Sequence, residues 1–262
     1  MVRDLLIRGM LAGVVASLLA FGVAKIYGEP QVDRAIAFEG RHARADASAQ
    51  APADAQISAQ QHQHGDEALV SRKVQSTAGL LTAVAVYGAA MGGLFALAFA
   101  FLYGRVGDLS PRLLALLLAI ATFVAIYYVP SLKYPASPPA VGEPDTIAYR
   151  TGLFFLMILI SLGGLVFAVA ASRRLAPRYG SLSAMLIGAG LFAAVVVIAQ
   201  LVLPDINEVP ADFPAIVLWK FRMASLAIQG LMWATLGLMF GWLAERVLGG
   251  RRAVVRPKLS SA

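Results

Sequence analysis

Apolar runs of about twenty residues recur along this chain, and they constrain its fold more than any other feature. An α-helix rises about 1.5 Å per residue, so such a run crosses the roughly 30 Å hydrocarbon layer of a bilayer. The composition agrees, because 59% of the 262 residues are hydrophobic and only 14% are charged, whereas about a quarter are charged in a soluble domain. We therefore predict a multi-pass membrane protein.

Six runs are long enough to span the membrane. They are continuously apolar rather than alternating, which favours helices over the strands of a barrel. The third run is the shortest, and Pro130 is expected to end it because its ring removes a backbone donor. The predicted fold is a single all-α integral membrane domain (1–262) of six transmembrane helices, arranged as three antiparallel hairpins, at about 5–26, 77–103, 113–129, 152–171, 182–203 and 223–247.

The basic residues predict the orientation. With the amino terminus placed in the cytoplasm, the inner segments hold twelve Lys and Arg and three acids, out of totals of 22 and 15. The outer segments then hold the remaining ten bases and twelve acids. Cytoplasmic loops carry an excess of Lys and Arg, so both termini are predicted to be cytoplasmic.

The two ends of the chain carry further signals. The basic tail, 248–262, is expected to face the anionic lipid of the bilayer, and we expect no nucleic-acid partner despite a pI near 9.9. The first segment has a basic start and an apolar middle, as a cleaved signal peptide does. Its apolar run is longer than usual for such a peptide, which favours retention, but cleavage stays open.

One connection is long and two outer loops resemble each other. Residues 27–73 are rich in Ala, Gln, Asp and Ser and are predicted to form a long extracytoplasmic loop that is flexible or only locally ordered. Each of the two shorter outer loops contains Pro-Ala-x-x-Pro, from Pro135 and from Pro210, and leads to an arginine, Arg150 or Arg222. The likeness indicates a repeated hairpin, although proline at helix ends is also common without any repeat.

The predicted spans carry no charge near their centres and no histidine. Intramembrane charges usually mark ion relays, so proton pumping and haem-linked electron transfer are not expected. Gln200 and Gln229 are the candidates for polar groups along a transport path; the competing interpretation is a hydrogen bond between helices. Arg150 and Arg222 are expected to snorkel from helix ends to the outer surface.

The long loop contains a candidate metal-binding sequence, Gln61-His62-Gln63-His64-Gly65-Asp66-Glu67. Residues two apart face the same side of an extended segment, and imidazole with carboxylate suits zinc, copper, nickel or cobalt. A solvated loop without metal is the alternative. The acids of the other outer loops are candidates for a vestibule that concentrates divalent cations: Glu143, Asp145, Asp205, Glu208 and Asp212.

Enzyme chemistry finds no support in the sequence. The chain has no cysteine, which excludes thiolate metal sites and iron–sulfur clusters. It contains no P-loop, no Gly-x-Ser-x-Gly and no His-Glu-x-x-His. We therefore predict no catalytic residues and no bound cofactor.

Three stretches of the sequence are similar to a known family: 129–147 with Arg150 and Thr151, 203–214 with 219–226, and 233–246. They resemble the CbtA family of predicted prokaryotic cobalt transporter subunits. The resemblance implies a multi-pass subunit of the prokaryotic plasma membrane that acts with CbtB, a small single-span partner with a histidine-rich segment, and a link to cobalamin biosynthesis. Members often carry a dense histidine run in the first outer loop, whereas this chain has only His62 and His64 with distant His42.

The resulting functional hypothesis is a membrane-spanning subunit of a divalent metal uptake system, with cobalt(II) as the transported ion. The metal would gather at His62, His64, Asp66 and Glu67 and pass between the helices. The alternative, motivated by the charge-free interior, is a scaffold or assembly subunit that positions a metal-binding partner without transporting anything.

Overall fold

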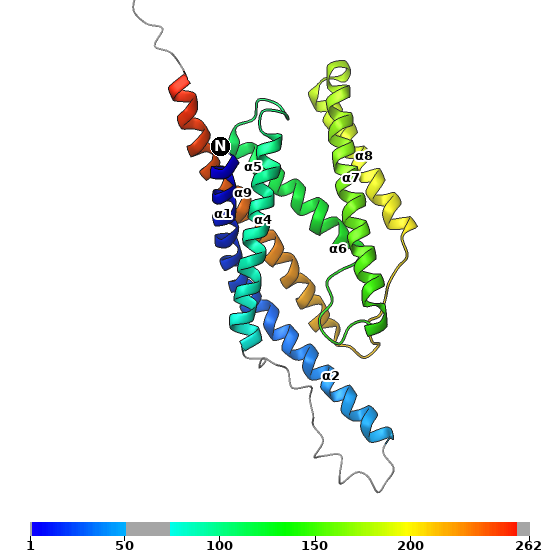
Figure 1. Cartoon of the computed structure of the whole chain (residues 1–262). Coiled ribbons are helices and arrows are strands. Elements are labelled where there is room, and N and C mark those ends of the chain that lie inside the picture. Colours follow the sequence, from blue (N-terminus) through cyan, green and yellow to red (C-terminus); the bar gives the residue numbers. More distant parts are fainter. Residues whose placement is uncertain (1, 51–73, 256–262) are drawn as a thin grey trace, which may run out of the picture.

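The computed structural model of the protein describes residues 2–50 and 74–255, and its regular elements in these ranges are all helices (Figure 1). Three short π-helical turns, η1, η2 and η3, interrupt or precede longer helices. The elements in order are α1 (Val2–Val23), η1 (Ala24–Gly28), α2 (Glu29–Gln50), η2 (Gln75–Gly79), α4 (Leu80–Leu102), α5 (Pro111–Thr122), η3 (Phe123–Tyr128), α6 (Val129–Lys133), the 3-10 turn η4 (Pro144–Thr146), α7 (Ile147–Tyr179), α8 (Ser181–Val202) and α9 (Ala215–Val255).

The prediction of six membrane-spanning helices is confirmed. Six continuous helical stretches of the described residues are long and apolar enough to cross a bilayer. Four of them extend well beyond the predicted bounds, because helix continues into polar sequence where hydropathy alone stops. The stretches are Val2–Ala45, Thr77–Leu102, Pro111–Lys133, Pro144–Tyr179, Ser181–Val202 and Ala215–Leu248.

Helices α1, α4, α5 and α9 share the largest hydrophobic core. Helix α1 packs against α4 and α9, and α5 packs against α9. Phe240 of α9 lies at the centre, fully buried, with its ring 5.0 Å from that of Phe99 and 5.4 Å from that of Phe95 in edge-to-face geometry. We call these four helices the core bundle.

Helices α7 and α8 form a second unit, the α7–α8 pair, which stands beside the core bundle in Figure 1. A single residue, Gly180, separates the two helices, and its φ of 81° is a conformation that glycine adopts readily. The pair contacts the rest of the protein through η3 and α6, near the end of the molecule where the loops 134–146 and 203–214 lie.

The packing differs from three self-contained hairpins. The first two spans do pack together, as α1 and α4, but α8 makes its extensive contact with α7, and α9 makes its own with α5 and α1. The short turn at Gly180 holds α7 and α8 together, whereas the longer connection from α8 to α9 allows α9 to join the core bundle.

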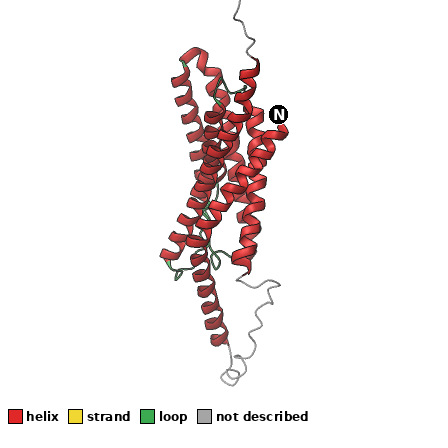
Figure 2. Ribbon diagram, turned by 90° about the vertical axis from the view of Figure 1, so that its left-hand side faces the viewer, coloured by secondary structure: helices red, strands yellow, loops and turns green. Residues whose placement is uncertain are grey.

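The described ends of α1 and α9 lie at the same end of the molecule (Figures 1 and 2). An even number of spans requires this placement. Which membrane face that end occupies remains a prediction from the basic residues.

The prediction of a loop over 27–73, flexible or only locally ordered, is wrong for its first half, because residues 29–50 form the continuous helix α2, which continues α1 through η1. Buried side chains recur along α2 at helical spacing, at Gln31, Ala35 and Phe38. Phe38 packs edge-to-face against Phe213 of the last outer loop, with ring centroids 5.0 Å apart. Packing against the outer loop buries this apolar face of α2 and so stabilises a helix in an otherwise polar sequence.

The prediction that Pro130 ends the third span is also wrong, since helix continues to Lys133. The wide turn η3 precedes the proline, and the N–H of Val129 donates to the carbonyl of Val124, five residues back. A π-helical turn changes which carbonyl lies opposite each following residue. The Pro130 ring therefore does not interrupt the helix. The span therefore reaches 23 residues.

Candidate functional site

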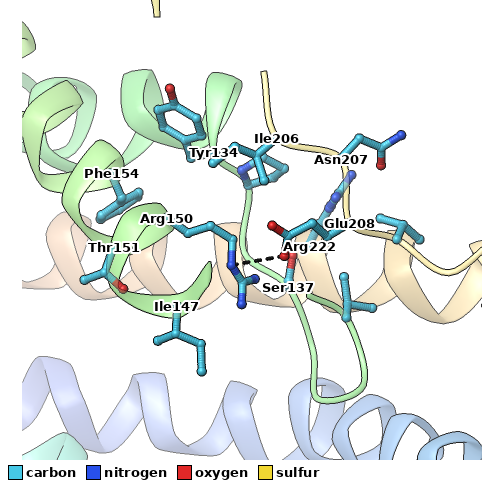
Figure 3. A pocket seen from close by; sticks show the side chains of 13 residues that line it. Tyr134, Ser137, Ile147, Arg150, Thr151, Phe154, Ile206, Asn207, Glu208 and Arg222 are labelled. Carbon is cyan, nitrogen blue, oxygen red and sulfur yellow. Dashed lines mark ion pairs between the residues drawn. The ribbon is translucent and has the colours of Figure 1, made fainter. Parts of the chain in front are cut away.

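The two proline-rich outer loops enclose a cavity of about 380 Å³ (Figure 3). Its wall includes Ser137 of the first loop and Asn207 of the second, together with residues from the first turns of α7 and from α9. The segments that resemble each other in sequence thus lie around one space. We call this space the outer cavity.

Arg150 enters the outer cavity from the start of α7. Its Nε lies 3.3 Å from Oε2 of Glu208 in an ion pair, drawn as a dashed line in Figure 3. Its Nη2 donates to the carbonyl of Glu143 over 3.1 Å. The guanidinium lies against Gly142, whose φ is 105°, and a Cβ at this glycine would overlap the guanidinium. Glycine is required here both for the backbone angle and for the space.

Glu208 holds the second loop to the first. Its carboxylate accepts hydrogen bonds from the backbone N–H of Glu143, at 2.8 Å, and from Oγ1 of Thr146, at 2.9 Å. These two bonds, followed by the charge of Arg150, lower the pKa of the Glu208 carboxyl below its ordinary value. The carboxylate therefore stays ionised and its charge is matched by Arg150.

Arg222 reaches the outer cavity from α9, and its charge is not matched in this way. Its Nε, like that of Arg150, is buried without a hydrogen bond to any described residue, but Arg150 has the Glu208 ion pair. The acid nearest in the wall, Glu208, is engaged by Arg150. Sequence reasoning placed both arginines at helix ends but assigned them to the outer surface. The signal for a shared site was that each arginine follows one of the two similar loops.

Lys133 and Tyr134 connect the end of α6 to the segment that follows α8. The Lys133 side chain is only 8% exposed; it pairs with Asp205 and donates to the carbonyl of Gln200 over 2.7 Å. The Tyr134 hydroxyl donates to the carbonyl of Pro204 over 2.9 Å. Burial, with Tyr149 and Asp205 nearby, raises the pKa of Tyr134, so the hydroxyl keeps the proton it donates.

Of the five acids predicted to form a cation vestibule, Glu208 lines the outer cavity and the others do not. Asp205 pairs with Lys133, and Asp212 pairs with Nε2 of His42 of α2 at 2.6 Å. Glu143 and Asp145 are exposed on the first loop. The structure thus brings three of these carboxylates to basic partners rather than to one another.

The two amides predicted for a transport path both contact other helices. Gln200 Nε2 of α8 points to the carbonyl of Val129 at a long 3.5 Å. The Gln229 side chain of α9 is hydrogen-bonded to the Tyr87 hydroxyl of α4. Each amide thus joins two spans, as expected for the alternative interpretation of a hydrogen bond between helices.

The predicted metal ligands His62, His64, Asp66 and Glu67 lie outside the described residues. Among the residues that the structure does describe, no group of three or more His, Cys, Asp or Glu side chains is positioned to hold a metal ion.

Comparison with known proteins identifies the family of the chain. No curated protein and no solved structure matches the sequence significantly. A protein-family model described as "Probable cobalt transporter subunit (CbtA)" matches residues 2–245. This range contains the first five spans and all but the last three residues of the sixth, together with both similar outer loops and the two arginines of the outer cavity. This multi-pass membrane protein therefore belongs to the CbtA family of probable cobalt transporter subunits.

Proposed function

We propose that this protein is the membrane-spanning subunit of a divalent metal uptake system that carries cobalt(II) and supplies cobalamin biosynthesis. The observation that carries the proposal is the family match over residues 2–245 in a chain with six spanning helices. The protein would reside in the plasma membrane of a prokaryotic cell. It acts as a transport component and not as an enzyme.

In this proposal the outer side of the membrane is the end at which the two proline-rich loops lie. The positive-inside asymmetry of the sequence supports this orientation. The candidate metal ligands, His62, His64, Asp66 and Glu67, belong to the segment that follows α2 and would collect the ion on that outer side.

The driving force is the membrane potential or a partner protein, since the sequence contains no ATP-binding motif. A potential of 100 mV, negative inside, favours inward movement of a divalent cation by about 4.6 kcal/mol, twice the single-charge value. This free energy is enough for strong accumulation without ATP.

A small single-span subunit of the CbtB kind is the proposed partner. This chain has few histidines in its first outer region, so metal capture is assigned mainly to the histidine-rich segment of that partner. The description of the family as a subunit supports the need for one.

A specific observation favours a second candidate function, that of a non-transporting scaffold. Gln229 is hydrogen-bonded across helices, Gln200 points to a neighbouring helix, and three outer acids have basic partners. In this candidate function the protein positions a metal-binding partner in the bilayer, and the partner alone contacts the ion.

Cobalt uptake measurements separate the two functions. Cells that carry the protein with its candidate partner, the protein alone, or neither are supplied with nanomolar radioactive cobalt, with nickel and zinc as competitors. Purified protein in liposomes with an imposed potential is then tested for flux. Transport predicts potential-dependent cobalt entry that requires this chain. Normal accumulation in cells without the protein contradicts the proposal, and flux that requires only the partner supports the scaffold.

A further inference from the structure

Two arginines from different parts of the sequence meet in the outer cavity. Arg150 follows the first proline-rich loop by entering α7, and Arg222 follows the second by way of α9. Figure 3 shows both guanidinium groups and the Glu208 carboxylate around the same space. The similarity of the two loops therefore has a structural consequence, since each delivers one arginine to a shared site.

The charges of this cavity do not balance. Within the part of the chain that the structure describes, Glu208 is the one acid in its wall, and it is already bound by Arg150, by Thr146 and by the N–H of Glu143. Arg222 has no ion-pair partner among the described residues, and its Nε is buried without a hydrogen bond. A buried N–H donor without a partner is costly, so a ligand that accepts a hydrogen bond from it would bind favourably here.

The polar groups in the wall of the outer cavity indicate the chemical class of its ligand. A guanidinium presents a planar set of N–H donors that matches carboxylate and phosphate oxygens. Ser137, Thr151 and Asn207 add neutral polar groups to the same wall. A space of about 380 Å³ falls within the range of small-molecule sites and greatly exceeds the roughly 30 Å³ of one water. An unpaired positive charge also repels a bare divalent cation.

We infer that the outer cavity binds a compact oxyanion, a carboxylate or a phosphate, with Arg222 as its principal ligand and Arg150 held beside it by Glu208. The oxyanion is either a free small anion or the phosphate of a lipid headgroup, because the cavity lies at the ends of membrane-spanning helices. This inference does not use the transport activity.

The test measures binding by the full-length protein in uncharged detergent. Citrate and inorganic phosphate are titrated calorimetrically into the wild type, Arg222→Gln, Arg222→Lys and Lys220→Gln. The last variant is the matched control, because Lys220 lies on the same helix and carries the same charge but lines a different cavity, with Trp219 and Met223. We expect binding by wild type and K220Q, and at least a tenfold loss in R222Q.

Arg222→Lys keeps the charge without the planar donor set, so it should bind more weakly than wild type and more tightly than R222Q. If R222Q does not fold, which size-exclusion chromatography detects, the comparison of wild type with R222K still tests the inference. A second arm uses nanodiscs of neutral phosphatidylcholine with and without phosphatidylglycerol. The bound oxyanion is a lipid headgroup if phosphatidylglycerol blocks citrate binding. The same conclusion follows if wild type enriches phosphatidylglycerol and R222Q does not.

The inference is overturned if neither anion nor phosphatidylglycerol binds the wild type, or if R222Q and R222K bind as the wild type does. Cobalt flux is not a readout here. A failure therefore leaves the proposed transport function standing, and a loss of cobalt uptake in the cell assay leaves the oxyanion site standing.

Discussion

Glycines lie at both the α1–α4 contact and the α7–α8 contact, but they pack against different parts of the facing helix. On α1 and α4, Gly9 and Gly13 face Gly92 and Gly88, and an added Cβ at any of the four would overlap the backbone of the facing helix. On α7 and α8, Gly164 faces the Val195 side chain and Gly188 faces mainly the Ser172 side chain. The first contact is backbone against backbone, and the second is largely backbone against side chain.

Burial follows the same division. One third of the most apolar stretch of α4 is buried within the protein, against 28% for the stretch that includes α7 and 17% for α8, so the difference lies mainly in α8. Lipid is as apolar as the side chains that face it, so membrane helices gain association energy from close packing rather than from hydrophobic burial. The core bundle is thus held by close packing along its length. The α7–α8 pair owes its position largely to α6, η3 and the outer loops.

The largest expected effect comes from enlarging a glycine at the α1–α4 contact. Gly13→Ala places a methyl group into the carbonyl of Gly88, and because the obstacle is backbone, the helices must separate. We expect a loss of about 3 kcal/mol, at the upper end of the range for overpacking, measured by unfolding in mixed micelles with increasing SDS.

Two matched variants in the α7–α8 pair complete this test. Gly164→Ala meets the Val195 side chain, which can rotate, so we expect a smaller loss of about 1 kcal/mol. Gly163→Ala, at the neighbouring position, meets nothing within 4 Å and should be neutral or slightly stabilising. Equal losses for G13A and G164A would refute the distinction between the two contacts.

The connection between the two units is tested at Gly142. Gly142→Ala strains a backbone with a φ of 105° and pushes Arg150 out of its place, for which we expect a loss of about 1–3 kcal/mol. Gly107→Ala is the control, because Gly107 also has a positive φ, 124°, but nothing lies within 4 Å of its added Cβ. Thermal unfolding in detergent should show the greater loss in G142A, and the difference isolates the Arg150 contact.

The spans could be predicted from sequence because hydropathy needs no tertiary information. The outcome at Pro130 could not, since whether a proline ends a helix depends on the hydrogen-bond register of the preceding turn, here η3. Helix α2 was not predicted for a related reason. Its buried positions, Gln31, Ala35 and Phe38, are too few and too polar to suggest a helix until the outer loop with Phe213 is in place.

The candidate site was predicted in outline only. The sequence indicates that the two proline-rich loops are related, but not that they meet. An acid on a loop looks equally suited to binding a cation or to pairing with a base, and only the fold brings Lys133 to Asp205 and Arg150 to Glu208. Such partners lie about 60 to 70 positions apart in the chain, a separation at which sequence spacing carries no information about contact.

The Glu208 carboxylate predicts a pH dependence for the outer loops. Because its folded-state pKa is lowered, its contribution is present above the ordinary glutamate pKa of about 4.5 and is lost as the pH falls through the lowered value. We expect the wild-type unfolding midpoint to fall over this range, while Glu208→Gln starts lower at pH 7 and changes less. Asp145→Asn removes an exposed acid of the first loop and should keep the wild-type profile. A Glu208→Gln profile parallel to wild type would show that another group is responsible.

The smallest effect is expected at the hydrogen bond between Gln229 and Tyr87, which ties α9 to α4 within the core bundle. Such bonds contribute about 0.6 kcal/mol on average in membranes, because the unfolded helices also find partners. Gln229→Leu and Tyr87→Phe should each cost about this amount, and the double variant should cost little more than either. Cobalt flux in liposomes then decides between the two roles of this amide. A structural tie predicts unchanged flux in both single variants, whereas flux that falls in Q229L and not in Y87F places Gln229 on the path of the ion.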